Sequence, residues 1–416
     1  MLKTNCRLCS SNNLKLFLDL GLQPPSDQFI NLKKTNQQTI FYPLKVMNCM
    51  KCGFKQLNYV VDPKILYQND YPYESSLTKA GSIHFDKFAD SVHEEFKFAK
   101  GSRVLDIGSN VGVLLSSFKK RNYNVLGIDP AKNITNIANR RGIKTLNGFF
   151  DNKFAKKFAK KNKKFKVITA TNVFAHVDNL NEFMTNIKRI LDKKGIFIVE
   201  APHFLNLVKN LEYDTVYHEH LSYITVGPLI SFFKKFKLKI IKVLNSDIHG
   251  GSIRIYICRE KDYLTQKNVK KTLQNEKTNK LNDLKQLSKF ANKVSQNRYS
   301  ILNFIINCKK NKKKIVALSA PAKGMTLLNF LRLDNHFLEY VTEKSKLKIG
   351  KYTPGTNLKV LSDDFLVKTM PDYALILAWN FKKEIIRNNL KYLNKGGKFL
   401  IPIPKLTIIS KKNFKK

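Results

Sequence analysis

Four cysteines near the start of the chain have the types and spacing of a metal site. They form two C-x2-C pairs with 39 residues between the pairs, namely Cys6, Cys9, Cys49 and Cys52. Two residues between paired cysteines let both sulfur atoms turn toward one ion, and four thiolates suit tetrahedral zinc. Because this ligand set leaves no open coordination position, we expect the Zn²⁺ to be structural. Disulfides and a redox C-x-x-C pair are the alternatives, which a cytosolic chain without a thioredoxin-like setting disfavours.

A second group of residues has the spacing of a site for an adenosine-containing cofactor. Gly108 and Gly112 follow the apolar run 104–107, and Asp129 ends the next apolar run, 125–128. Glycines let a backbone approach a ligand closely, and an acid about twenty residues on can accept hydrogen bonds from both hydroxyls of a ribose. The turn is not G-x-G-x-x-G, so pyrophosphate cradling is not the first interpretation. An ordinary βαβ unit, in which the glycines serve only turns, is the alternative.

Histidines form a third group that could move a proton. The segment 171–177 reads T-N-V-F-A-H-V and contains His176, while 217–223 reads Y-H-E-H-L-S-Y and contains His218, Glu219 and His220. A histidine can accept a proton near neutral pH, and a neighbouring carboxylate can orient the ring and raise its basicity. Incidental surface histidines are one alternative. A catalytic metal site is another, although adjacent residues lack the helical i, i+4 spacing of such ligands.

Alternating apolar runs predict the elements that must position these groups. Strands are expected at 104–107, 125–128, 167–170 and 195–200, and helices at 114–120, 135–140 and 180–191, with 239–243 antiparallel to 252–258 at the end. Such alternation implies a mainly parallel sheet covered by helices, with ligands at the carboxyl ends of the strands. The predicted fold class is therefore α/β.

The chain divides into four expected parts. Residues 1–65 are turn-rich and hold both cysteine pairs, so they are expected to be a small zinc-binding lobe. A helix at about 77–98 begins the cofactor-binding domain, 66–260, which is expected to be Rossmann-like. Residues 261–300 are expected to form one long amphipathic connecting helix. A second α/β pattern, with apolar runs at 315–320 and 375–379, occupies 301–416 and is also expected to be Rossmann-like.

The amino-acid composition limits the classes of partner and the location that we expect for this protein. The formal net charge is +44, from 75 Lys and Arg against 31 Asp and Glu, which invites a nucleic-acid interpretation. The lysines are scattered among Asn and Ile, however, so we expect no specific nucleic-acid partner. No run of eighteen uncharged apolar residues occurs, and the first residues lack a signal-peptide pattern, so we expect no membrane insertion and a cytoplasmic location. We also expect a monomer.

Several motifs in order along nearly the whole chain resemble a known family. Besides the cysteine pairs, D-I-G-S-N-V-G and the two histidine segments, they are Y-P-Y-E-S-S at 71–76, H-G-G-S-I-R at 249–254 and A-P-A-K-G at 320–324. Together they resemble the three-domain S-adenosylmethionine-dependent sugar C-methyltransferases, which methylate carbon 3 of thymidine-diphosphate 4-keto-deoxysugars. The resemblance implies a class I methyltransferase core, S-adenosylmethionine as cofactor, and a nucleotide-diphosphate keto-deoxysugar as partner.

The resemblance also implies roles for individual residues. His220 would be the catalytic base, assisted by Glu219, His176 and Tyr217. The cofactor-binding residues would be Asp106, Gly108, Asn110, Gly112, Asp129 and Asn172. The substrate-binding residues would be Tyr71, Tyr73, Asn172, Tyr217 and Lys323, with Tyr73 competing with Tyr71 for one role. Ser319 departs from the family, whose members often have glycine there, which weakens any Gly-rich nucleotide turn in the second α/β half.

The reaction is chemically reasonable without the resemblance. A ketone acidifies the hydrogen on the adjacent carbon, so a base near neutrality can form an enolate that attacks a sulfonium methyl group. Methylation of another anionic small molecule at oxygen or nitrogen is the alternative among enzymes. A zinc-containing nucleic-acid-binding protein with a degenerate methyltransferase fold is the alternative from a different class.

Overall fold

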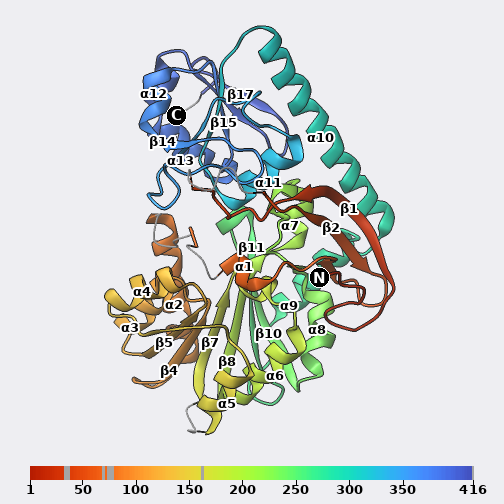
Figure 1. The fold of residues 1–416 in the computed structure, drawn as a ribbon. Helices are drawn as coiled ribbons and strands as arrows, with labels where there is room; N and C mark the ends of the chain where they lie inside the picture. The colour runs from red at the N-terminus through yellow and green to blue at the C-terminus, as the bar shows by residue number, and fades with distance from the viewer. Residues whose placement is uncertain (32–37, 68–70, 73–78, 161–163, 415–416) are drawn as a thin grey trace. The chain divides into compact units, whose positions relative to one another are not determined.

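The computed structural model describes residues 1–416 except 32–37, 68–70, 73–78, 161–163 and 415–416 (Figure 1). Contacts divide the chain into two compact units that each combine separated segments. The first unit contains Met1–Leu16, Met47–Asn206 and Glu219–Asp283. The second contains Phe17–Val46, Leu207–His218 and Leu284–Lys416. The predicted domain boundaries at 65, 260 and 300 stay a prediction. The two compact units are defined by contacts and combine separated segments, so they do not test boundaries drawn along the sequence.

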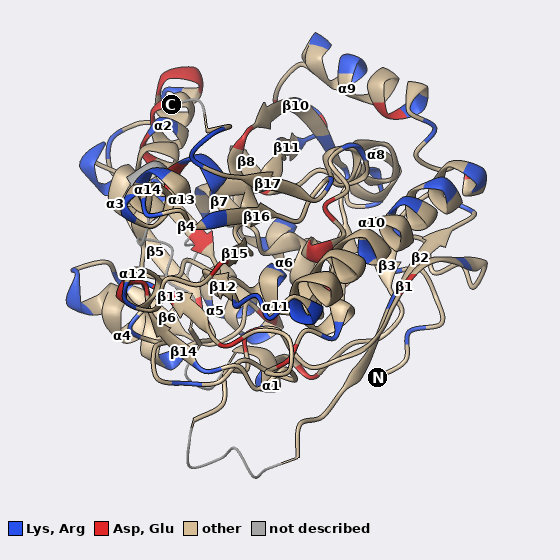
Figure 2. Cartoon of the chain, turned by 90° about the horizontal axis from the view of Figure 1, so that it is seen from above, with Lys and Arg blue, Asp and Glu red and all other residues tan. Residues whose placement is uncertain are grey.

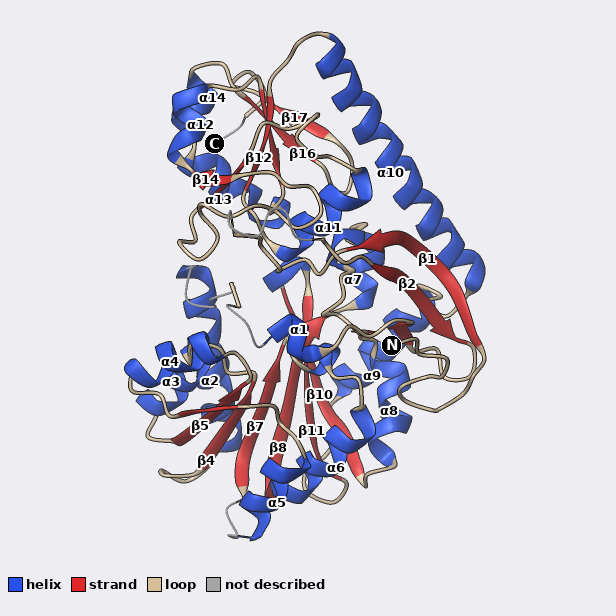
Figure 3. Cartoon of the chain, in the orientation of Figure 1, coloured by secondary structure: helices blue, strands red, loops and turns tan. Residues whose placement is uncertain are grey.

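A seven-stranded sheet forms the centre of the first unit, in the order β10-β11-β8-β7-β4-β5-β6 (Figure 3). Its strands are β4 Arg103–Ile107, β5 Asn124–Asp129, β6 Thr145–Asn147, β7 Phe165–Thr171, β8 Leu191–Pro202, β10 Leu238–Ser246 and β11 Ser252–Arg259. Strands β4 to β8 are parallel, and β11 is antiparallel to both β8 and β10. The α/β fold class and the antiparallel ending are thus confirmed.

Helices cover both faces of this sheet because successive residues of a buried strand point to opposite faces. Val104 packs with apolar residues of α2 (Lys79–Phe96) and α3 (Val113–Lys120). Leu105 lies in the other apolar cluster, which includes side chains of α5 (Asn152–Lys160), α6 (Leu180–Ile190) and α8 (Val226–Lys234). Helix α4, Lys132–Arg140, follows β5. The sequence prediction missed the short β6, which has only three residues, and also missed α5, although Phe154 and Phe158 recur there at helical spacing.

The region around the cysteines is more regular than expected. A four-stranded sheet has the order β1-β2-β3-β9, with β1 Leu14–Gln23, β2 Tyr42–Cys49, β3 Lys55–Leu57 and β9 Ser222–Tyr223. Helix α1, Pro63–Tyr67, follows. Strand β1 has leucine at every second position from Leu14 to Leu22, a period-two signal for a strand that the sequence prediction overlooked.

The single connecting helix predicted for 261–300 is wrong. Two helices occupy this stretch and its continuation: α9, Lys267–Thr278, belongs to the first unit, and α10, Leu284–Lys310, to the second. Lys280 between them has a φ of 49°, a left-handed conformation that ends a helix. The side chain of Asn282, in the turn between the two helices, accepts a hydrogen bond from the buried Lys55 ammonium at 2.5 Å. This hydrogen bond fixes the turn to the first unit.

A six-stranded sheet with the order β14-β13-β12-β15-β16-β17 forms the second unit's core (Figure 3). Its strands are β12 Ile315–Leu318, β13 Val341–Glu343, β14 Val360–Ser362, β15 Tyr373–Ile376, β16 Lys398–Ile401 and β17 Thr407–Ile409. Only β17 is antiparallel to its neighbour. The helices after these strands are α11 Ala322–Leu331, α12 Asp364–Thr369, α13 Lys382–Asn388 and α14 Leu390–Asn394. The expected second α/β pattern is confirmed.

The basic residues are dispersed rather than gathered on one element. Figure 2 shows Lys and Arg on helices of both units, including α3, α9 and α10. Within the described residues, no helix combines the length and apolar character needed to cross a membrane.

A buried charged cluster ties α2 to the first sheet. Glu200 on β8 and Arg254 on β11 are cross-strand partners, and Arg254 Nε donates to Glu200 Oε2 at 2.8 Å. His84 on α2 contacts the other carboxylate oxygen at 2.6 Å. Burial opposes the charge of Glu200, but its hydrogen bond with His84 and the charge of Arg254 outweigh burial and lower its pKa.

Replacement of Arg254 should therefore destabilise the protein strongly. Arg254→Met leaves a carboxylate that is 1% exposed without its cation, which should cost about 3 kcal/mol or more at neutral pH. The loss should shrink as the pH falls below about 4, because a carboxyl group with a lowered pKa stabilises the fold only while it is ionised. Urea denaturation followed by circular dichroism would measure the free energy of unfolding at each pH. The exposed pair of Lys313 with Asp372 provides the control, and Lys313→Met should cost less than about 1 kcal/mol.

Candidate functional site

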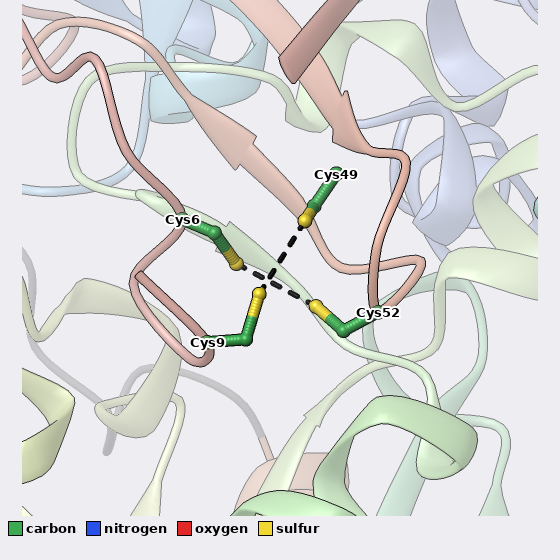
Figure 4. A group of neighbouring side chains, drawn as sticks. All are labelled: Cys6, Cys9, Cys49 and Cys52. Carbon is green, nitrogen blue, oxygen red and sulfur yellow. Dashed lines mark hydrogen bonds between the residues drawn. The ribbon is translucent and has the colours of Figure 1, made fainter. Parts of the chain in front are cut away.

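The four cysteines of the predicted metal site converge in the first unit. All four sulfur atoms lie within 4.8 Å of one another, and Figure 4 shows them pointing toward a common centre. The Sγ atoms of Cys6 and Cys52 are 3.6 Å apart, as are those of Cys9 and Cys49. A tetrahedron with Zn–S bonds of about 2.3 Å would place its sulfur atoms about 3.8 Å apart. The arrangement therefore fits one Zn²⁺ with four thiolate ligands.

The thiols of the cluster compete for protons. The hydrogen bond from Cys52 lowers the pKa of Cys6 to about 5, and that same contact raises the pKa of Cys52. A cation would remove this competition, because each sulfur atom would then be stabilised as a thiolate. Cys258 and Cys308, predicted to be buried packing residues, are buried and take no part in the cluster.

The turn after β4 has the backbone conformation that the glycines were expected to provide. Gly108 has a φ of 65° and Gly112 a φ of 80°. A Cβ atom on Gly108 would lie 2.3 Å from Val173 Cγ2, and one on Gly112 would lie 2.7 Å from Ile143 Cγ2. Neither position accepts a side chain without displacement of its neighbour. Asn110, in the same turn, is also left-handed, with a φ of 49°.

Asp129 ends β5 beside this turn. Its Oδ2 atom accepts a hydrogen bond from the Asn110 amide at 3.0 Å, and its Oδ1 atom accepts one from the Ala131 amide at 2.9 Å. Burial raises its pKa, although these two amides oppose the shift. Each carboxylate oxygen keeps a further lone pair for a ligand hydroxyl. The geometry thus suits the predicted ribose contact.

Asp106 lies one strand position before Ile107 and is buried. Thr169 Oγ1 donates a hydrogen bond to its Oδ1 atom at 2.6 Å. Burial raises the pKa of Asp106 to about 7, with a smaller contribution from the charge of Asp129. This carboxyl group can therefore bind a polar group in either protonation state near neutral pH.

The histidine segments meet within the first unit. The ring centroids of His176 and His220 are 5.1 Å apart, and Tyr71 donates its phenol hydrogen to Glu219 Oε2 at 3.0 Å. Burial lowers the pKa of His176, and the nearby His220 lowers it further. His176 Nε2 is buried without a hydrogen-bond partner among the described residues. Burial and the neighbouring His220 thus both favour the neutral form of His176.

Asn172 lies at the carboxyl end of the same sheet, directly after β7. It has a φ of 55°, and its amide donates to the carbonyl of Glu200 at 2.7 Å. This left-handed conformation fixes the turn into the short helix Phe174–His176, which carries His176. The parallel strands therefore bring Gly108, Asp129 and Asn172 to one edge of the sheet, where α/β domains bind ligands.

Tyr217, His218 and Lys323 belong to the second unit, and Tyr73 lies outside the described residues. His218 is 1% exposed, and burial lowers its pKa to about 4, which suits a buried neutral ring.

Two sets of contacts were not predicted from the sequence. Tyr67 stacks on His176 with ring centroids 6.0 Å apart and an angle of 9° between the planes. In the second unit, Trp379 Nε1 donates to Asp214 Oδ2 at 2.6 Å, and Lys323 Nζ lies 3.9 Å from the Trp379 ring centroid. No spacing signal links residues so far apart in the chain. The chain's single Trp, close to the end of a predicted strand, could have marked this position as a candidate site.

Three segments of the chain match family models. Residues 6–67 match the family described as "Putative zinc binding domain", 82–243 match "Methyltransferase domain", and 247–404 match "C-methyltransferase C-terminal domain". C-methyltransferase NovU of Streptomyces niveus is 30% identical over 408 residues, covering 97% of this chain and 96% of that protein. Ubiquinone biosynthesis O-methyltransferase of Rickettsia bellii is 24% identical over 127 residues, which are 30% of this chain and 52% of that protein.

Two solved structures each align with less than half of the chain. A S-adenosylmethionine-dependent methyltransferase from Clostridium acetobutylicum aligns with 43% of this chain and 92% of its own, at 13% identity and a TM-score of 0.34. Magnesium protoporphyrin IX methyltransferase from Synechocystis aligns with 45% of this chain and 90% of its own, at 12% identity and a TM-score of 0.35.

We predict one tightly held zinc ion per chain. Cys49→Ser should reduce zinc content by replacing a thiolate with a poor ligand, and should unfold the surrounding segment, since structural zinc supplies on the order of 10 kcal/mol. Elemental analysis and thermal denaturation would measure both effects. Cys308→Ser, at a buried cysteine outside the cluster, should retain the metal. Full stability of the unsubstituted protein after zinc removal would exclude a structural metal.

We also predict that Asp129→Ala weakens binding of S-adenosylmethionine at least tenfold. Loss of the carboxylate removes a charged acceptor for the ribose hydroxyls, which is worth roughly 1.5 to 3 kcal/mol. Isothermal titration calorimetry would measure the affinity. Asp192→Ala, at a partly exposed residue paired with Lys166, is the control and should bind as the unsubstituted protein does. Equal affinities in both variants would place the cofactor elsewhere.

Proposed function

Because the chain belongs to the family of S-adenosylmethionine-dependent C-methyltransferases, we propose that it methylates carbon 3 of a nucleotide-diphosphate 4-keto-deoxysugar. One observation above all supports the proposal. His176, His220, Glu219 and Tyr71 gather in the same unit as the glycine turn and Asp129. A proton-transfer group thus shares a unit with the predicted cofactor turn.

The proposed reaction begins with proton removal. His220 takes the hydrogen from carbon 3, and the C–H electron pair moves into an enolate whose charge rests on the C4 oxygen. S-adenosylmethionine supplies an electrophilic methyl group when bound. The enolate carbon then forms a bond to that methyl as the C–S bond breaks, leaving S-adenosylhomocysteine. The protein's task is to hold carbon 3 in line with the methyl group and to exclude water.

Local contacts suit His220 for this role. The low pKa of His176 keeps that ring neutral, so a proton gained by His220 meets no second positive ring. Glu219 is adjacent in sequence to His220. The Tyr71 hydroxyl donates a hydrogen bond to the Glu219 carboxylate at 3.0 Å and so orients it. We assign Glu219, His176 and Tyr217 to supporting catalytic roles.

The other predicted residues complete the proposal. Asp106, Gly108, Asn110, Gly112, Asp129 and Asn172 would bind S-adenosylmethionine. Tyr71, Tyr73, Asn172, Tyr217 and Lys323 would bind the nucleotide sugar. We further expect a cytoplasmic monomer without a specific nucleic-acid partner, which size-exclusion chromatography and salt-dependent gel shifts would check.

A panel of substrates tests the reaction. The protein would be incubated with methyl-labelled S-adenosylmethionine and several nucleotide 4-keto-6-deoxyhexoses, and the products analysed by mass spectrometry and carbon NMR. A labelled methyl carbon bonded to carbon 3 is the expected result. A label on oxygen or nitrogen would instead identify an O- or N-methyltransferase of another anionic molecule.

We predict that His220→Asn slows the chemical step by about a hundred- to ten-thousandfold, because asparagine cannot accept the proton. Affinities for cofactor and sugar should stay near their original values. In heavy water with S-adenosylhomocysteine bound, the unsubstituted enzyme should exchange the C3 hydrogen of the keto sugar, and the variant should not. NMR would follow the exchange.

A matched histidine provides the control. His336 is exposed and pairs only with Asp334 among the described residues, so His336→Asn should preserve both turnover and exchange. If His220→Asn exchanged the hydrogen as fast as the unsubstituted enzyme, the base would be another group.

A further inference from the structure

Three aromatic rings meet at the predicted proton-transfer group of the first unit. Tyr67, at the end of α1, stacks on His176 with ring centroids 6.0 Å apart and an angle of 9° between the planes. The His176 ring in turn lies 5.1 Å from the His220 ring, at an angle of 33°. The proposed reaction gives roles to both histidines and none to Tyr67. The Tyr67 ring nevertheless lies nearly parallel to the neighbour of the base, at a separation typical of aromatic pairs.

His176 depends on packing for the orientation of its ring. It is the last residue of the short helix Phe174–His176, and its Nε2 atom is buried without a hydrogen-bond partner among the described residues. Rotation of an imidazole about χ2 has only broad, two-fold preferences. A ring without a hydrogen bond at Nε2 is therefore oriented mainly by the side chains that pack on it, and Tyr67 is one of these.

Tyr67 is held relative to the cofactor turn, which is the segment 108–112. Its ring meets that of Tyr71 edge to face, with centroids 5.9 Å apart and an angle of 62° between the planes. Tyr71 packs against an apolar cluster that includes Val111 of the cofactor turn, and its carbonyl accepts a hydrogen bond from Asn133 Nδ2 at 3.0 Å. Packing through Tyr71 thus links the Tyr67 ring to the cofactor turn.

The two tyrosines contact both neighbours of the base. Tyr67 stacks on His176, and the Tyr71 hydroxyl donates a hydrogen bond to Glu219, the residue before His220. Each of these contacts joins the histidine group to the segment that carries the tyrosines. Loss of either contact would therefore leave the base less firmly oriented, even if no group that exchanges a proton were removed.

We infer that Tyr67 is a positioning residue for the base: its ring fixes the orientation of His176, and His176 fixes that of His220. This inference rests on the proposed function, because it assigns the base to His220. In this role Tyr67 acts through the histidines rather than on the substrate. The aromatic ring is the part that contacts His176, so phenylalanine at this position should serve as well, and leucine should not.

Proton removal can be measured separately from methyl transfer. The full chain with S-adenosylhomocysteine bound would be incubated in heavy water with a thymidine-diphosphate 4-keto-6-deoxyhexose, and exchange of the C3 hydrogen followed by NMR. Tyr67→Leu should slow this exchange and kcat by roughly ten- to a hundredfold, since displacement of a reacting group by about 1 Å costs on the order of a hundredfold. The KM for the keto sugar should stay within about threefold, because uniform substrate binding is unchanged.

Two further variants separate positioning from other effects. Tyr67→Phe keeps the ring and should retain both rates within about threefold. Tyr299→Leu, at a tyrosine that is 61% exposed on α10, should leave both rates unchanged. Zinc content and affinity for S-adenosylhomocysteine should be equal in all variants, as expected of an intact fold and cofactor turn. Equal rates for Tyr67→Leu and Tyr67→Phe, or a loss confined to KM, would overturn the inference.

NMR of histidine-labelled protein measures the stack without turnover. In the unsubstituted protein, the His176 ring protons should show nuclear Overhauser contacts with the Tyr67 ring, and a ring-current shift that Tyr67→Phe preserves. Absence of these contacts would overturn the inference, even if Tyr67→Leu failed to fold.

These measurements also distinguish the inference from the proposed function. A methyl group on carbon 3, together with full activity of Tyr67→Leu, would support C-methylation and overturn the role of Tyr67. A methyl group on oxygen or nitrogen, transferred slowly by Tyr67→Leu and at the normal rate by Tyr67→Phe, would overturn C-methylation and support the role of Tyr67.

Discussion

Parallel pairing of β4 with β5 and β7 is the constraint on which the site in the first unit depends. It brings the ends of three strands to one edge, so that Gly108, Asp129 and Asn172 converge although they span 65 residues of the chain. The turn after β4 must then bend sharply. Gly108 makes this possible because Val173 occupies the space that a side chain would need.

Burial at this edge gives its titratable groups their properties. Asp106 and Asp129 have raised pKa values because they lose water, whereas His176 has a lowered pKa for the same reason. The pKa of the equally buried Glu200 is instead lowered, because Arg254 and His84 compensate its negative charge. Burial thus favours the neutral forms of these three groups, whereas at Glu200 the paired charges offset burial and join α2 to the sheet.

The second unit applies the same geometry with different chemistry. The strand-end carboxylate of Glu343 accepts three amides, from Ala320, Lys344 and Ser345, and Ser319 stands where the first turn has glycine. The aromatic and cationic groups near it, Trp379 and Lys323, have no equivalent among the residues named at the first sheet's edge.

The sequence by itself determined the α/β class, both parallel sheets and the zinc-type cysteine set, because strand periodicity and C-x2-C spacing are local properties. It also singled out Asp129 and His220, whose neighbours in the chain form recognisable motifs. Only the tertiary structure decided that α9 and α10 are separate helices, that Tyr67 stacks on His176, and that Asp214 binds Trp379. These depend on contacts between distant segments or on one left-handed residue, and neither leaves a periodic signal in the chain.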